Sequence, residues 1–324
     1  MLNLGIIGTG DIVTKFISGA KLCKNASLTA LYSRTKERGN FFAKQYGIPH
    51  VFSDFDKFVL SDKFDAVYIA SPTSCHAQQS IALLKAKKHI LCEKPAASNV
   101  RELTEVLACA KENNLVFLEA MRPMFSPGFA WIKDNLFKLG KIHQATLKFC
   151  KHSTRYDNFK NGIVENAFRP QLSNGALTDI GVYPAAIMRA LFGYPEKIAS
   201  FAEIIPGSID ASGAFLAYYK DFFVAVSYSK VNDSETASEI IGENGSHVYS
   251  PGSNPADVFI KYRDGRIEKA DIFTEKYDLC YEIDAFAKMI QTGGAENYNK
   301  LTIDTLRILD TVRKQCGIVF PADK

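Results

Sequence analysis

The chain has 324 residues, of which 47% are hydrophobic and 23% are charged. This length and composition are typical of a folded protein of about two domains, and they exclude disordered, collagen-like and disulfide-stapled chains. The 39 basic and 35 acidic residues give a net charge of +4, which is too small and too evenly spread to predict a nucleic-acid-binding surface.

Seven cysteines are scattered along the chain, without a CxxC pair and without a histidine cluster at zinc spacing. We therefore expect reduced thiols, a cytoplasmic protein and no metal site. A strand-like run begins at Leu2, so the sequence predicts no secretory leader. No stretch approaches the roughly 18 uninterrupted apolar residues of a membrane-spanning helix, and we expect no membrane partner.

Short apolar runs alternate with segments of helical period from Met1 to about Ala120, which is the pattern of βαβ units and a parallel sheet. The predicted strands are residues 2–8, 27–33, 66–70, 89–92 and 115–119. The predicted helices are residues 15–23, 36–46, 76–86 and 100–112. Residues 1–120 are thus predicted to form a doubly wound, dinucleotide-binding Rossmann domain of the α/β class.

The pattern changes between residues 121 and 127. A predicted helix at 129–138 is followed by alternating apolar runs at 142–152, 198–205, 214–219 and 222–229. Turn signals separate these runs and predict a second domain over residues 121–324 with a mostly antiparallel sheet; the family resemblance described below implies that this domain is of the α+β class and that its sheet is large and open. Two final helices, at 279–291 and 302–314, could pack on the first domain. An uncovered apolar sheet face needs a partner, so we predict a homodimer or a dimer of dimers.

A glycine-rich turn joins the first predicted strand to the first predicted helix and consists of Gly8, Thr9, Gly10, Asp11 and Ile12. The first glycine allows a tight turn, and the second lets the backbone approach a pyrophosphate at the helix N-terminus. Val13 replaces the third glycine of the usual GxGxxG pattern. The alternative is a glycine turn that binds no ligand.

The second predicted strand ends at Ser33 and is followed by Arg34 and Arg38, where an NAD-preferring site would have an acidic residue. A hydroxyl followed by cations suits a 2′-phosphate. The sequence therefore favours NADP(H) as cofactor, with NAD(H) as the alternative because Glu37 lies among the cations. Arg38 could also belong to a solvated basic helix start.

Glu93 and Lys94 directly follow a predicted strand of the parallel sheet. Ligands bind at the carboxyl ends of such strands, so we expect both side chains to project into the cofactor crevice. A lysine ammonium there can polarise a substrate oxygen and lower the pKa of a neighbouring hydroxyl. The alternative is an ordinary surface lysine in a loop.

These motifs, together with three further segments, resemble the Gfo/Idh/MocA oxidoreductases. The further segments are Ala70, Ser71, Pro72 and Thr73 with His76, then Glu119 and Ala120, and then the run GALTDIGVY from Gly175 to Tyr183. The resemblance covers nearly the whole chain. It implies an N-terminal dinucleotide fold whose cofactor lies near residues 70–73, His76 and Arg122, and a C-terminal sheet that supports dimerisation.

The resemblance also implies three catalytic roles. Lys94 would be the catalytic lysine, Asp179 would position substrate or lysine, and Tyr183 would be the acid/base where many relatives have histidine. A tyrosine at this position is similar to the branch of glucose-fructose oxidoreductase, dimeric dihydrodiol dehydrogenase and NADP-dependent D-xylose dehydrogenase. In this sequence Met124 occupies a position where that branch commonly has arginine, and Ala186 replaces a common Asp or Asn.

The chemistry of these residues agrees with such roles. If a helix opens at Asp179, a spacing of four puts Asp179 and Tyr183 on one face. A nearby lysine ammonium would lower the pKa of the phenol from its reference value of about 10. We expect hydride transfer between nicotinamide and the carbonyl or hydroxyl carbon of a small sugar, polyol or cyclic diol. This requires Lys94 and Tyr183 to meet beside the nicotinamide.

Three alternatives remain at this stage. Tyr183 could be an ordinary packed aromatic residue. The protein could be a redox sensor that binds NADP(H) without chemistry, which would need neither Lys94 nor Tyr183. It could also be a scaffold that uses the open sheet of residues 142–270 and needs no cofactor.

The segment 151–170 is long, polar and aromatic, and it leads to the helix that carries Tyr183. We expect it to close over the active site as a loop and to contact the substrate. The candidate contacts are Arg155, Tyr156, Asn166, Phe168 and Arg169. The alternative is a solvated loop without a ligand.

Overall fold

The computed structural model describes the whole chain, residues 1–324, which divides into two compact units. One unit consists of Met1–Ala120 and Glu275–Ile303. The other consists of Met121–Thr274 and Asp304–Lys324. Each unit is therefore built from two stretches of chain, and the helix α10 (Ala295–Cys316) contributes residues to both.

The first unit contains a six-stranded, fully parallel sheet in the order β3-β2-β1-β4-β5-β6. Its strands are β1 (Leu2–Ile7), β2 (Ala26–Tyr32), β3 (His50–Phe52), β4 (Ala66–Ile69), β5 (His89–Glu93) and β6 (Phe117–Ala120). The strand order reverses between β1 and β4, and ligands bind at the carboxyl ends of strands at such a switch point. The predicted doubly wound Rossmann fold is confirmed.

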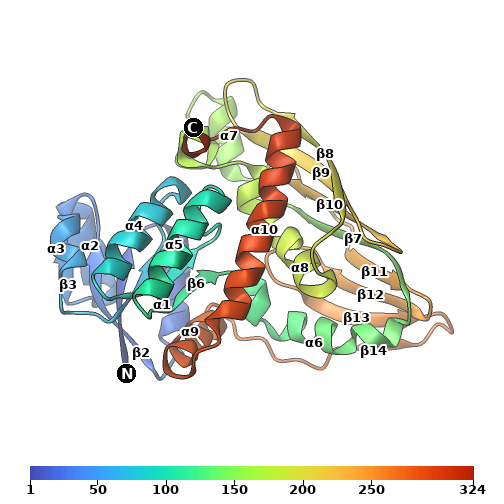
Figure 1. Ribbon diagram of the computed structural model, residues 1–324, viewed down its shortest axis with the longest axis horizontal. Helices are drawn as coiled ribbons and strands as arrows, with labels where there is room; N and C mark the ends of the chain where they lie inside the picture. The colour runs from blue at the N-terminus through green and yellow to red at the C-terminus, as the bar shows by residue number, and fades with distance from the viewer. The chain divides into compact units, whose positions relative to one another are not determined.

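The helices of this unit are α1 (Asp11–Ala20), α2 (Lys36–Tyr46), α3 (Phe55–Val59), α4 (Thr73–Lys85), α5 (Val100–Glu112) and α9 (Cys280–Thr292). Figure 1 shows α4 and α5 packed side by side along the sheet. Helix α9 packs on α1, where a Cβ on Gly19 would come within 2.9 Å of the Cys280 backbone nitrogen. No helix in the chain has the length and apolar character needed to span a membrane.

The second unit contains an eight-stranded sheet in the order β14-β13-β12-β11-β7-β10-β9-β8. Its strands are β7 (Ile142–Cys150), β8 (Lys197–Ile204), β9 (Asp210–Tyr218), β10 (Phe223–Ser229), β11 (Ser238–Gly242), β12 (Gly245–Ser250), β13 (Ala256–Tyr262) and β14 (Ile267–Lys269). Only β7 and β10 pair in parallel, so the predicted mostly antiparallel sheet is confirmed.

One face of this sheet packs against helix α8 (Val182–Phe192), as Figure 1 shows. Inward-facing residues such as Leu147, Val224 and Val226 are buried there. The unit also contains α6 (Pro127–Asn135), α7 (Thr154–Lys160), the 3-10 turns η1 (Arg122–Phe125), η2 (Leu136–Leu139), η3 (Asn166–Phe168), η4 (Pro170–Leu172) and η6 (Pro321–Asp323), and the π-helical turn η5 (Leu177–Gly181). The opposite sheet face exposes large apolar side chains.

Two local expectations need correction. The segment 151–170 is not a plain loop, because it contains α7 and η3, whose aromatic residues pack on one another. The helix that carries Tyr183 does not open as a regular α-helix at Asp179, because η5 precedes α8 and has the wider hydrogen-bond spacing of a π-helix. The four-residue spacing of an α-helix therefore does not apply from Asp179 to Tyr183.

Candidate active site

The glycine turn lies at the carboxyl end of β1. Gly8 has φ +116, and a Cβ there would lie 2.7 Å from the Ala70 carbonyl oxygen, so only glycine allows this approach of the β1 and β4 ends. A Cβ on Gly10 would meet nothing within 4 Å, and no side chain caps α1 at this residue. Open space before uncapped N–H groups fits the pyrophosphate of a dinucleotide.

One of the two arginines after β2 contacts the same turn. Arg38, in α2, donates a hydrogen bond of 3.1 Å to the Thr9 carbonyl oxygen. Ser33 is buried and its hydroxyl donates to the Thr35 carbonyl oxygen, whereas Arg34 is exposed. The structure therefore brings Arg38 to the glycine turn.

His76 joins the loop after β4 to the loop after β5. It is buried in α4, and its two ring nitrogens lie 2.8 Å from the Ser71 carbonyl oxygen and 2.9 Å from the Pro95 carbonyl oxygen. Burial lowers the pKa of the imidazole. No group of three or more His, Cys, Asp or Glu side chains in the chain is arranged to hold a metal ion.

Two buried carboxyl groups hold the backbone around Lys94. Glu93 accepts from the Tyr68 hydroxyl at 2.5 Å and from the Lys94 amide at 3.2 Å. Glu119, at the end of β6, accepts from the Ala96 amide at 2.9 Å. Between these contacts the Lys94–Pro95 peptide bond is cis, and the Lys94 side chain is half-buried. The side chain of Glu93 thus lies inside the unit beneath the loop.

The second unit brings Asp179 to a lysine that the sequence analysis missed. The Lys230 ammonium lies 2.8 Å from Asp179 Oδ2 and directly follows β10. Tyr183 lies in the first turn of α8, is half-buried, and has its ring 5.7 Å from that of Phe149. A charge at the end of the apolar run 223–229 was the one signal that could have indicated Lys230.

The predicted substrate contacts divide into an aromatic group and a charged group. Phe168 is buried and stacks with Tyr156 at 6.0 Å between ring centroids. Arg155 pairs with Glu165 at 3.4 Å, and Arg169 donates to the Val164 carbonyl oxygen. Asn166 belongs to neither group, and its carbonyl oxygen accepts from the Asn174 side chain. Arg122 of η1, which was predicted to contact the cofactor, donates to Ser253.

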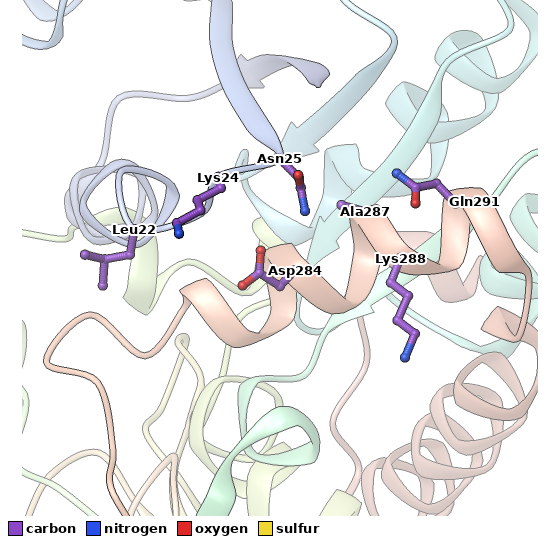
Figure 2. A pocket seen from close by; sticks show the side chains of 7 residues that line it. All are labelled: Leu22, Lys24, Asn25, Asp284, Ala287, Lys288 and Gln291. Carbon is purple, nitrogen blue, oxygen red and sulfur yellow. The ribbon is translucent and has the colours of Figure 1, made fainter.

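The structure contains two notable cavities, one away from the predicted site residues and one that borders them. The first, of about 500 Å³, is lined by Leu22, Lys24, Asn25, Asp284, Ala287, Lys288 and Gln291. Figure 2 shows Asn25 extending toward Asp284 of α9 while Lys288 points away, and no predicted site residue lines this cavity. The second, of about 440 Å³, is lined in part by Phe168 and Arg169.

Burial of Glu119 gives a testable dependence of stability on pH. Burial raises the pKa of its carboxyl from 4.5 to about 7, so between these values the native state holds a proton that the unfolded chain has released. This contribution to stability is full below about pH 4.5 and is lost as the pH rises to about 7. We expect a loss of up to about 3 kcal/mol in the free energy of unfolding over this window, and a flatter profile for Glu119→Gln.

Urea unfolding of the full chain between pH 4.5 and 7.5 measures this difference. Glu105→Gln, at an exposed position on α5, is the control and should keep the wild-type slope. Identical slopes for wild type and Glu119→Gln would contradict the assignment.

Comparison with known proteins identifies the family. A model described as oxidoreductase family, NAD-binding Rossmann fold, matches residues 2–121, and the Gfo/Idh/MocA C-terminal domain model matches residues 137–248. The chain is 39% identical to scyllo-inositol 2-dehydrogenase (NADP(+)) IolU of Bacillus subtilis over 100% of both chains. It is 25% identical to trans-1,2-dihydrobenzene-1,2-diol dehydrogenase of Bos taurus, over 100% of this chain and 99% of that protein.

A solved structure shows the same fold. KijD10, a 3-ketoreductase from Actinomadura kijaniata in complex with NADP and TDP-benzene, matches with a TM-score of 0.87 and 20% identity, covering 98% of this chain and 99% of that one. The resemblance inferred from the motifs is confirmed: the chain belongs to the Gfo/Idh/MocA family of oxidoreductases with an NAD-binding Rossmann domain.

Proposed function

We propose that this protein is an NADP-dependent dehydrogenase of cyclic polyols and related sugars or diols. The observation that carries the proposal is the 39% identity, over the full length of both chains, with an NADP-dependent scyllo-inositol 2-dehydrogenase. A D-xylose 1-dehydrogenase (NADP(+)) of Haloferax volcanii, 24% identical over 96% of both chains, supports the wider substrate class. We place the protein in the cytoplasm, because seven scattered cysteines suit a reducing compartment.

The residues after β2 support NADP(H) over NAD(H). Arg38 is held at the glycine turn through Thr9, and Arg34, four positions earlier in the chain, is exposed. Guanidinium groups recognise phosphate through paired, charge-assisted hydrogen bonds. We therefore assign Arg34 and Arg38 to the 2′-phosphate and the open backbone at Gly10 to the pyrophosphate.

Arginine substitutions test this cofactor assignment. Arg34→Ala and Arg38→Ala should each raise the Kd for NADPH by about 10- to 100-fold, because each removes charge-assisted hydrogen bonds of about 1.5–3 kcal/mol. The Kd for NADH should stay within about threefold. Fluorescence titration measures both, with Lys36→Ala, at an exposed position between the two arginines, as control. An equal loss for the two cofactors would count against recognition of the 2′-phosphate.

The charges around Asp179 favour a neutral substrate. The nearby cations of the second unit already have partners, since Lys230 pairs with Asp179, Arg155 with Glu165, and Arg169 with a carbonyl oxygen. The Asp179 carboxylate keeps 41% of its side chain exposed. An exposed carboxylate accepts hydrogen bonds from hydroxyl groups and repels anions. We therefore assign a polyhydroxylated, uncharged ring or chain to this site.

Lys94 and Tyr183 carry the proton transfer in the proposed mechanism. NADP(H), when bound, supplies or accepts the hydride. The Tyr183 hydroxyl removes the proton of the substrate hydroxyl during oxidation and returns it during reduction. The Lys94 ammonium stabilises negative charge on that oxygen. Asp179 holds a neighbouring substrate hydroxyl, and Glu93 and Glu119 fix the loop that presents Lys94.

A substrate panel with two variants tests the enzyme assignment. Wild type should reduce NADP+ with scyllo-inositol, D-xylose or a trans-dihydrodiol, whereas a redox sensor would turn over none of them. Lys94→Ala and Tyr183→Phe should each lower kcat by about 10² to 10⁴-fold and leave the Kd for NADPH within about threefold. The exposed Lys111→Ala and Tyr194→Phe are matched controls. Wild-type rates in either site variant would remove that residue from the mechanism.

We further propose that the exposed sheet face forms a homodimer. Its large apolar side chains are Phe201, Leu216, Tyr218 and Phe223, with exposed fractions of 79%, 40%, 48% and 38%. Leu216 lies opposite Ala199 and Ala225, and Tyr218 lies opposite Phe223, so these residues form one continuous patch on β8, β9 and β10. A self-complementary sheet face related by a two-fold axis would cover this patch.

Charges introduced into the patch test the dimer. The double variant Phe201→Glu/Leu216→Glu should sediment as a monomer at micromolar concentration, because unpaired charges would be buried at the interface. Wild type and the control Phe41→Glu, at an exposed site on α2, should sediment as dimers or larger assemblies. A monomeric wild type, or a dimeric double variant, would exclude this interface.

A further inference from the structure

Lys230 is a buried cation that joins three segments of the second unit. Its side chain is 2% exposed. The ammonium lies 2.8 Å from Asp179 Oδ2, donates a 3.3 Å hydrogen bond to the Ala167 carbonyl oxygen, and lies 5.5 Å from the centre of the Phe168 ring. An ammonium has three donors, and a carboxylate, a carbonyl oxygen and an aromatic face together stabilise it away from water.

The main chain of the same residue is fixed as well. The Lys230 amide donates to the Ala211 carbonyl oxygen of β9, and the Lys230 carbonyl oxygen accepts from the Ser153 amide, which precedes α7. Main chain and side chain together connect the sheet, the segment 151–170 and the π-helical turn η5. The position of the ammonium is therefore set by the sheet.

The turn η5 is held from two directions. Asp210, buried in β9, accepts from the Leu177 amide at 2.7 Å at the start of the turn. Lys230 binds Asp179 in its middle. The turn leads directly into α8, whose second residue is Tyr183. The orientation of the Asp179 carboxylate thus depends on a cation that lies behind it.

Burial is unequal across this ion pair. Lys230 is almost fully enclosed, whereas 41% of the Asp179 side chain is exposed. If Asp179 lost its charge, the buried ammonium would lose its ion-pair partner and keep only the Ala167 carbonyl oxygen and the field of the buried Asp210 carboxylate, which is destabilising. If Lys230 were replaced by an apolar residue of similar length, the carboxylate would still reach water. The two partners are therefore expected to differ in what they contribute to stability.

We propose that Lys230 is a positioning residue that acts through Asp179, keeping this carboxylate aimed at the substrate while it holds the segment 151–170 beside it. The substrate-binding role of Asp179 in this inference rests on the proposed function. The stability difference between the two partners does not depend on that function.

A double-mutant cycle measured by kcat/KM tests whether Lys230 acts through Asp179. Lys230→Met should lower kcat/KM by about 10- to 100-fold, mainly through KM, and leave the Kd for NADPH unchanged. In the Asp179→Asn background the same substitution should change kcat/KM by less than threefold, because the carboxylate it orients is gone. Lys160→Met removes an exposed cation of the same segment, one that pairs with Asp157, and should stay within threefold of wild type.

Two activity results would overturn the proposal. One is a wild-type kcat/KM in Lys230→Met. The other is a fold loss in kcat/KM of the double variant that equals the product of the losses of the two single variants. Lys230→Gln keeps a donor without the charge and provides a second test should the methionine variant fold poorly. Its kcat/KM should fall between those of wild type and Lys230→Met, and a wild-type value would contradict a role for the charge.

Thermal unfolding gives a readout that is independent of turnover. Asp179→Asn should lower Tm, and Lys230→Met/Asp179→Asn should regain part of this loss because no buried ammonium that has lost its ion-pair partner remains. If wild type turned over no substrate but this recovery were seen, the proposed function would fail while the ion pair kept its structural assignment. A double variant less stable than Asp179→Asn alone would contradict the inference itself.

Discussion

Two buried carboxyl groups and one buried imidazole hold the main chain on either side of Lys94. Glu93 binds the Lys94 amide, Glu119 binds the Ala96 amide, and His76 contacts the Pro95 carbonyl oxygen. These contacts come from β5, β6 and α4, so the packing of the parallel sheet sets the course of the loop.

Asp179 is organised by the same principle in the second unit. Its carboxylate is half-exposed, and the group that orients it, Lys230, is enclosed between Asp179, Phe168 and the Ala167 carbonyl oxygen. In each unit, buried polar groups fix the position of a polar residue whose own side chain reaches solvent. Such inner groups must be fully hydrogen-bonded, since a buried polar atom without a partner is costly. The buried groups that support Lys94 and Asp179 are therefore as hard to replace as Lys94 and Asp179 themselves.

The sequence predicted the long elements and the motifs that end strands, because periodicity and glycine turns are local signals. The parallel sheet, the glycine turn and the exposed sheet of the second unit could be anticipated in this way. The pairing of Lys230 with Asp179 joins residues 51 positions apart, and no local pattern encodes it. Short elements such as β3 and α3 were missed because three to five residues carry too little periodicity. The π-helical turn at Asp179 depends on packing against β10 and on Asp210, so helical period alone could not indicate it.

The close contact of α1 with α9 also bears on how the protein is made. Gly19 lies so near the Cys280 backbone that a methyl group would not fit, yet 261 positions separate the two residues along the chain. A ribosome that has synthesised the six strands of the parallel sheet has not yet produced the helix that covers α1. The dinucleotide-binding unit is therefore the first to begin folding but must wait for nearly the entire polypeptide to emerge before its surface is complete.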